Sequence, residues 1–430
     1  MPFKFKISEE YRNPTKILII FCLIMGGEII FGLPFHLVRY FRPTFIDVFN
    51  ISNTQLGDAM AIYGITAMLS YFPGGIIADY LSARRLMSIS LLATALGGFY
   101  LTTIPGQMGL SIVFGYWGVT TILLFWSAMI RATREWGGKL AQGRAFGILD
   151  GGRGLFGAGA ATIAVFFLAA FFPKDLENIS PDQRRQAMVA VIYFYTFLTM
   201  GAAILIWFII PDSGNNKKKN NNSSNRLSGI VTVLKNRSAW LQAIIVICAY
   251  CGYRGLDFYA LYGIDILGMN EVSAARFVSN ATFLRPVGAI LAGFLADRFS
   301  SKKVIGVTFT LLIICYAILM IFTSNHSAYM VLMINFVFTF LAVYALRGVY
   351  FALFEEMQIS GTVTGTTVGL VSIIGFTPDI FFNSIAGRII DASPGYQGYQ
   401  NFFLFLACFA GVGLIATSIL AYRIKSRNPA

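Results

Sequence analysis

The chain consists largely of apolar runs, each about as long as a helix that crosses a membrane. A helix needs about 20 apolar residues to span the hydrocarbon core of a bilayer, and about twelve runs among the 430 residues reach that length. They lie near 17–47, 54–79, 86–104, 109–131, 145–171, 188–210, 238–263, 273–297, 304–323, 328–352, 365–388 and 399–422. The sequence therefore predicts an all-α integral membrane protein with twelve transmembrane helices. The first run is overlong and contains Pro34 and Pro43, so we expect it to be bent.

Composition and charge agree with a membrane location. With 56% hydrophobic and 12% charged residues, the chain lacks the polar surface that a soluble protein of this length needs. The net charge of +13 comes from Lys and Arg in short segments between runs, mainly before the first run and after every second one. This distribution is a topology signal rather than a nucleic-acid surface, and it predicts that both termini are cytoplasmic.

A polar segment divides the chain into two halves. Residues 211–237 are rich in Asn, Lys and Ser and cannot bury a core. We therefore expect an N-terminal six-helix bundle at 1–210, a cytoplasmic linker at 211–237 and a C-terminal six-helix bundle at 238–430.

One loop sequence occurs in both halves. Gly75-Ile-Ile-Ala-Asp79-Tyr-Leu-Ser-Ala-Arg84-Arg85 follows the second run, and Gly293-Phe-Leu-Ala-Asp297-Arg298-Phe-Ser-Ser-Lys302-Lys303 follows the eighth. This loop resembles the G-x-x-x-D-R-x-G-R-R signature of the major facilitator superfamily, which recurs between helices 8 and 9. The first copy departs from it at Tyr80 and Ser82. The resemblance implies two pseudo-symmetric bundles around a central cavity that opens alternately to each side.

Arg131 and Arg347 form a related pair near the ends of the fourth and tenth runs. In the family that the loop resembles, such arginines commonly pair with the loop Asp and latch one side of a half shut. We therefore expect a gating role for five residues: Asp79, Arg84, Arg131, Asp297 and Arg347.

Ionisable residues inside the runs are candidates for function, because a charge within a bilayer is costly. Arg39 and Arg254 lie 215 positions apart, close to the 218 that separate Gly75 from Gly293, so they are candidate counterparts in helices 1 and 7. Two guanidiniums facing each other across a cavity favour an anion between them, and Arg binds carboxylate or phosphate in bidentate fashion.

The segments around Arg39 and Arg254 also resemble the organophosphate:phosphate antiporter branch, where an Arg on each helix holds phosphate. The His of that branch in helix 5 is replaced by the segment Asp150-Gly-Gly-Arg153. The substrate-binding candidates are Arg39, Arg254, Arg285, Tyr63, Tyr253 and Tyr259. In the alternative interpretation, Arg39 pairs with Glu28 or a lipid headgroup and Arg254 with Asp257.

Coupling to an ion gradient requires a carboxylate that changes protonation, and burial raises the pKa of a carboxylate. Three residues qualify, namely Glu28, Asp257 and Asp379. Asp257 is three residues after Arg254, so the two can pair on one helix face. A static ion pair is an equally open interpretation for each of the three.

The sequence thus predicts a secondary transporter for a small organic anion: a sugar phosphate, sugar acid or carboxylate. Transport would be proton symport or exchange against a counter-anion. A neutral sugar or drug carrier of the same fold is the alternative, and a transporter-like sensor or a membrane-embedded enzyme is the alternative of another class. We expect no enzymatic activity, cofactor, metal or nucleic-acid partner, and a monomer surrounded by lipid in a bacterial inner membrane.

Overall fold

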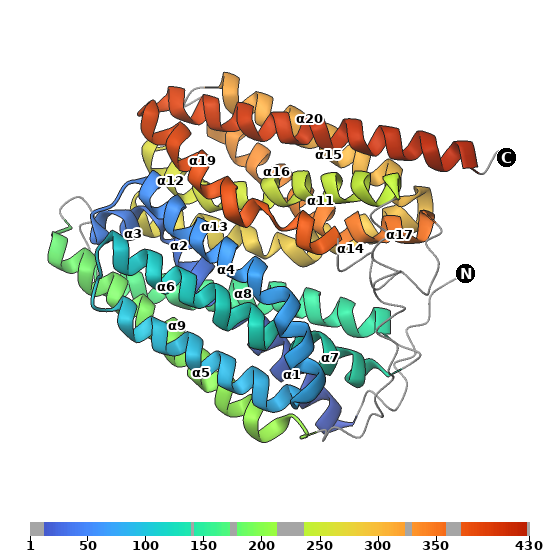
Figure 1. Cartoon of the computed structure of the whole chain (residues 1–430). Coiled ribbons are helices and arrows are strands. Elements are labelled where there is room, and N and C mark those ends of the chain that lie inside the picture. The colour runs from blue at the N-terminus through green and yellow to red at the C-terminus, as the bar shows by residue number, and fades with distance from the viewer. Residues whose placement is uncertain are drawn as a thin grey trace.

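The structure is a computed structural model that describes residues 13–138, 142–172, 179–212, 236–322, 329–357 and 371–427 (Figure 1). The regular structure in these residues is helical throughout. The first half contains α1 (Pro14–Ile29), η2 (Gly32–His36), α2 (Leu37–Tyr40), α3 (Arg42–Phe49), α4 (Asn53–Tyr80), α5 (Ala83–Leu101), α6 (Gln107–Val119), η3 (Thr120–Trp126), α7 (Ser127–Gly137), α8 (Gln142–Ala170) and α9 (Pro181–Ile209).

The second half repeats this arrangement. It contains α11 (Arg237–Gly255), η4 (Leu256–Phe258), α12 (Tyr259–Asp265), α13 (Glu271–Thr282), α14 (Leu284–Phe299), α15 (Ser301–Ile321), α16 (Tyr329–Val349), η6 (Tyr350–Ala352), α17 (Leu353–Glu356), α19 (Pro378–Ala392) and α20 (Tyr396–Arg427). Residues 371–375 form a further helical segment before α19. Figure 1 shows the helices of the two halves as two groups that lie side by side.

The predicted membrane spans agree with these helices. In the described part of the chain, nine helices are long and apolar enough to cross a membrane, and ten if the bent pair at the N-terminus counts as one span. With α4, of 28 residues, and α5, of 19, they make up the twelve expected spans. The start of the eleventh run, before residue 371, lies outside the described residues, as does most of the predicted linker.

The first span is bent, as its prolines predict. The axis turns by 42° between Pro14–Ile29 and Gly32–Tyr40. Pro34 lies in η2, a π-helical segment, where its missing N–H and its ring disturb the normal i to i−4 hydrogen bonds. Pro43 stands in the first turn of α3, where a proline is tolerated.

At one end of the bundle the two halves pack closely, and glycines make this possible. A Cβ atom on Gly57 or Gly64 of α4 would overlap the backbone of α19, and one on Gly387 of α19 would overlap the backbone at Asn53. Small residues of this kind let membrane helices approach backbone to backbone. The two helices therefore seal one end of the space between the halves.

Polar contacts strengthen the same end. Arg388 of α19 pairs with Asp58 of α4 at 2.7 Å, and Glu271 at the start of α13 accepts hydrogen bonds from Arg184 at 2.6 Å and Thr44 at 2.5 Å. Further hydrogen bonds between the halves lie at this end and around the central cavity (those of residues 39, 40, 53, 54, 285 and 391 among them). We call the end of the bundle at which α4 and α19 pack together the closed end. It lies opposite to the start of α1 and the end of α20 (Figure 1).

Candidate functional site

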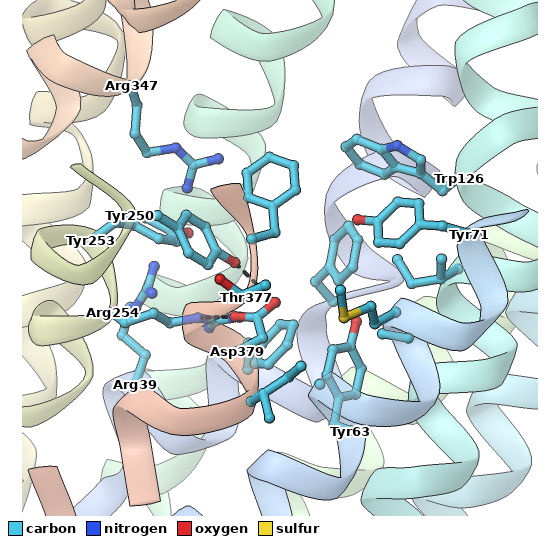
Figure 2. Close-up of a pocket in the computed structure, with 18 of the residues that line it drawn as sticks. Arg39, Tyr63, Tyr71, Trp126, Tyr250, Tyr253, Arg254, Arg347, Thr377 and Asp379 are labelled. Atoms are coloured by element: carbon cyan, nitrogen blue, oxygen red, sulfur yellow. Dashed lines mark hydrogen bonds and ion pairs between the residues drawn. The ribbon is translucent and has the colours of Figure 1, made fainter. Parts of the chain in front are cut away.

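A cavity of about 100 Å³ lies between the two halves, next to the closed end (Figure 2). Its walls come from α1, η2, α2, α4, η3 and α8 of the first half, and from α11, α14, α16 and 371–380 of the second. Its charged and aromatic lining residues include Glu28, Phe31, Phe35, His36, Arg39, Tyr63, Tyr71, Trp126, Arg153, Tyr250, Tyr253, Arg254, Arg285, Arg347 and Asp379.

Irregular helical turns supply many of these side chains. The π-helical segment η2 carries Phe35 and His36, and a second π-helical segment, η3, carries Ile122 and Trp126. The 3₁₀ segment η4 places Asp257 directly behind the cavity wall. Wider or tighter turns change the direction of side chains and leave backbone groups exposed to partners, and π-bulges are frequent at functional sites.

Asp257 bridges the two arginines that the sequence pairs as a clamp. Its Oδ1 lies 2.6 Å from Nε of Arg39, and its Oδ2 lies 3.6 Å from Nη1 of Arg254. All three side chains are buried. The two guanidiniums therefore meet at one carboxylate of the protein, on the same side of the cavity, and do not face each other across it (Figure 2).

Arg254 makes its shorter contacts with Asp379. Nε and Nη2 of Arg254 lie 2.6 and 2.5 Å from Oδ1 of Asp379, and Tyr250 donates to Oδ2 at 3.2 Å. Figure 2 shows the contact between Arg254 and Asp379 at the cavity. Asp379 follows Pro378 at the start of α19. The side chain of Asp379 is 15% exposed, compared with 1% for Asp257, so of the two carboxylates it is the more accessible from the cavity.

A second ion cluster lies around Glu28. Its carboxylate contacts Arg153 and Arg285, each at 3.1 Å, and His36 at 3.4 Å. Arg285 also reaches Asp150 at 2.9 Å and so joins α14 to α1 and α8 across the halves. Among the described residues, Glu28 pairs with these groups rather than with Arg39.

Arg347 reaches the cavity and, among the residues that the structure describes, has no carboxylate within 4 Å; Asp150 acts on its charge from farther away. Its guanidinium carbon lies 3.9 Å from the centre of the Tyr253 ring, and that of Arg39 lies 4.1 Å from the same centre. In Figure 2 Tyr253 lies between the two guanidiniums. An aromatic face attracts a cation, and Tyr253 thus holds both arginines at the cavity wall.

The expected ion pair between Arg347 and Asp297 is therefore wrong. Asp297 is exposed at the end of α14, whereas Arg347 lines the cavity. The reason is that the helical run of α16 continues through η6 and α17 to Glu356, so Arg347 lies inside this run and not at its end.

The cavity has a surplus of positive charge. Five arginines line it: Arg39, Arg153, Arg254, Arg285 and Arg347. Four of them contact four carboxylates, those of Glu28, Asp150, Asp257 and Asp379. In the described part of the chain the fifth, Arg347, is the source of the remaining charge.

The tyrosine candidates have different places. Tyr63 and Tyr253 line the cavity, and the Tyr63 hydroxyl lies 2.9 Å from Oγ1 of Thr121. Tyr259 packs instead against Phe336 and Phe340 in the core of the second half, with ring centres 5.2 and 5.3 Å away. Six residues after Tyr253, it points to another face of the helix. Its predicted contact with substrate is a misassignment.

The remaining gating candidates lie near the end opposite to the closed one. Arg131 bonds the carbonyl oxygens of Ala78 and Leu81 at 2.7 and 3.3 Å, and pairs with Glu135 at 3.0 Å. Arg84 pairs with Asp212 at 2.6 Å, just beyond α9. The backbone of Asp79 is part of α4, but its side chain lies outside the described part of the structure.

Comparison with known proteins shows which family has this architecture. E. coli (strain K12) inner membrane proteins YihN and YqcE are 30% and 28% identical, over 94% and 98% of this chain and 95% and 97% of their own length. The crystal structure of a point mutant of nucleoside transporter NupG matches with a TM-score of 0.73 at 14% identity, covering 94% of this chain and 99% of that one. The family model of the Major Facilitator Superfamily matches residues 17–375. The chain is an integral membrane transporter that belongs to the Major Facilitator Superfamily.

Proposed function

We propose that this transporter moves a small organic anion, such as a sugar phosphate, a sugar acid or a carboxylate, by alternating access. The observation that carries the proposal is Arg347, a cation at the wall of an intramembrane cavity that has no carboxylate within 4 Å among the described residues. A charge at this depth is costly unless it has a counter-ion. A guanidinium also matches carboxylate and phosphate in geometry. An anionic substrate supplies the missing charge.

Arg39 and Arg254 take part after the substrate has entered. Both hold internal carboxylates, at 2.6 Å from Asp257 and at 2.5 Å from Asp379. A substrate anion competes with these carboxylates, and a proton on either carboxylate releases its arginine. The arrangement therefore supports proton symport, and it equally supports exchange of one anion for another.

The proposed orientation places both termini in the cytoplasm of a bacterium. The distribution of Lys and Arg supports it, and the E. coli relatives carry the name inner membrane protein. With this orientation the closed end faces the outside, and the structure corresponds to a state closed to the outside. Arg388, Asp58 and Glu271 then belong to the outer gate.

A neutral sugar or drug carrier is the second candidate. The internal pairing of Arg39 with Asp257 and of Arg254 with Asp379 favours it, because paired arginines need no further anion. NupG, whose fold is similar, is described as a nucleoside transporter. A sensor or a membrane-embedded enzyme would leave a labelled compound outside sealed vesicles, and an uptake assay separates both from a carrier.

A thermal-shift screen of the purified protein tests the proposal. The compounds are sugar phosphates, sugar acids, carboxylates, neutral sugars and inorganic anions, and the variants are Arg347→Gln and, as a control, Arg298→Gln at the exposed end of α14. A ligand at 100 times its Kd stabilises by about 2.7 kcal/mol.

We expect anions to stabilise the parent and the Arg298→Gln variant, and Arg347→Gln to lose the response. Hits are then tested for uptake in proteoliposomes. Stabilisation by neutral compounds alone, equal in all variants, would overturn the proposal in favour of the neutral carrier.

A further inference from the structure

The cavity has two chemically different walls. In Figure 2, Arg39, Arg254, Arg347 and Asp379 lie on one side, and Tyr63, Tyr71 and Trp126 lie on the other. The charged wall is mostly from the second half, whereas the aromatic wall comes from α4 and η3 of the first half. A substrate that touches both walls has an anionic group at one end and an uncharged surface at the other.

The aromatic wall is held in place before any substrate arrives. Phe31 packs edge-to-face on Trp126 with ring centres 6.2 Å apart, and Phe35 packs edge-to-face on Tyr63 at 4.6 Å. The Tyr63 hydroxyl is fixed by Thr121. Such ring pairs prefer this T-shaped geometry, so the wall is a preorganised surface rather than a set of mobile side chains.

The ring of Phe35 is covered by another side chain, so its face is not available to a substrate. Its face is covered by the guanidinium of Arg254, whose carbon lies 4.0 Å from the ring centre. Trp126 and Tyr71 lie across the cavity from Arg39, Arg254 and Arg347 (Figure 2), and Arg153, whose guanidinium carbon lies 5.9 Å from the centre of the Trp126 ring, is the arginine on their side. Trp126 is the last residue of the π-helical segment η3 and lines the cavity.

The following inference rests on the proposed function. We propose that the substrate is an anion with a single ring, which places its anionic group at Arg347 and packs the ring on Trp126 and Tyr71. The cavity, of about 100 Å³, is smaller than the apolar cavity of about 150 Å³ that holds one benzene molecule, so it leaves no room for a second ring beside the first. Trp126 is then the residue that distinguishes a ring from an open chain.

Matched pairs of compounds test this inference on the full-length protein in detergent and in proteoliposomes. Glucuronate and gluconate are six-carbon monoanions that differ in being a ring or an open chain, and benzoate and hexanoate form a second pair. Glucose is the neutral ring. The variants are Trp126→Leu, Trp126→Phe and Arg347→Gln, with Trp207→Leu as the control, because Trp207 is 42% exposed on the outer surface.

We expect at least one ring anion to bind about tenfold more tightly than its open-chain partner, the scale of an aromatic contact together with its buried area. Trp126→Leu should remove this difference and leave the Kd of the open-chain anion within about twofold of the parent. Trp126→Phe should restore part of it, and Arg347→Gln should weaken both anions. If Trp126→Leu does not fold, Tyr71→Leu takes its place in the same comparison.

The outcomes separate this inference from the proposed function. Equal binding of both members of each pair, or a ring preference that Trp126→Leu leaves intact, overturns the inference while the anion carrier stands. If no anion binds to the parent, the proposed function fails, and the inference that rests on it fails with it.

Discussion

The ion pair between Arg39 and Asp257 gives the sharpest energetic prediction. We consider Arg39→Gln, Asp257→Asn and the double variant, which remove one charge or both; Asn keeps the shape of Asp, whereas Gln is shorter than Arg. Nε of Arg39 lies 2.6 Å from the Asp257 carboxylate, and the two side chains are 5% and 1% exposed. In either single variant the remaining charge therefore stays largely buried, and Arg39 meets solvent or added anions only through the cavity that it lines.

The magnitude follows from this burial. Removing one partner of a buried ion pair typically costs about 3–5 kcal/mol, because the other charge stays buried without compensation. The double variant leaves two neutral amides, and a hydrogen bond in a membrane protein contributes only about 0.6 kcal/mol on average. We therefore expect the double variant to be more stable than either single variant. The coupling energy should be at least about 3 kcal/mol, within the range measured for close charge pairs.

Equilibrium unfolding of the four proteins in mixed micelles measures the cycle. Arg254 keeps its contact with Asp379 in every variant. The cycle therefore measures the interaction of Arg39 with Asp257. Among the described residues, the 3.6 Å contact of Asp257 with Arg254 is the one other ion pair that Asp257→Asn changes. If the costs of the two single variants add in the double variant, the side chains are not paired in the folded state and the reasoning fails. Added phosphate should stabilise Asp257→Asn, whose Arg39 lacks its anion, more than Arg39→Gln.

Three further predictions concern the closed end and the opposite end. Gly64→Val should lower the melting temperature, because its Cβ would overlap the backbone of α19, whereas Gly75→Val should not, since nothing lies within 4 Å of that position. Asp58→Asn breaks a 2.7 Å ion pair at the closed end. The pair is half exposed, so its loss should destabilise the closed end only slightly. Spin labels across that end should then show a somewhat larger share of wide distances. The pKa of Asp212 lies below its usual range, because the Ser82 hydroxyl and then an arginine bond its ionised form. The contact of Asp212 with Arg84 of α5 is therefore present at neutral pH and is lost in acid, at a pH below the ordinary pKa of an aspartate. Hydrogen exchange near residue 84, measured as a function of pH, would detect this loss.

The fold could be predicted because a bilayer imposes one length on every span. Twelve apolar runs appear in the sequence and correspond to the helices of the structure, and Pro34 marks the bend of the first span. Arg39 and Arg254 could be found for a related reason. A charge inside an apolar run is costly and stands out from its neighbours.

The position of Arg347 could not be predicted in the same way. Pseudo-symmetry makes it the counterpart of Arg131, but Arg131 bonds the carbonyl oxygens at the end of α4, whereas Arg347 turns into the cavity. Internal symmetry relates positions along the chain and does not fix where a helix ends. Here the helical structure continues from α16 through η6 and α17, beyond the end that the sequence predicts.

The aromatic wall could not be predicted either. The chain has 40 Phe and 20 Tyr, so an aromatic residue in a membrane helix carries no signal of its own. Trp126 is the last residue of the π-helical segment η3, which contains no proline or glycine that would mark it in the sequence. Arg153 was likewise recognisable as a partner of Glu28 only from the packing of a helix distant in sequence, and His36 reaches Glu28 across the bend of the first span.

The contacts of Asp257 connect substrate binding to the movement of the halves. Arg39 belongs to the first half and Asp257 to the second, so any event that neutralises Asp257 also breaks a bond between the halves. If a proton is that event, Asp257→Asn should still exchange anion for anion but should no longer accumulate substrate against a gradient when driven by a pH difference in proteoliposomes. If the variant keeps this pH-driven accumulation, the coupling proton binds elsewhere. Asp379, which is the more accessible carboxylate, is then the next residue to replace.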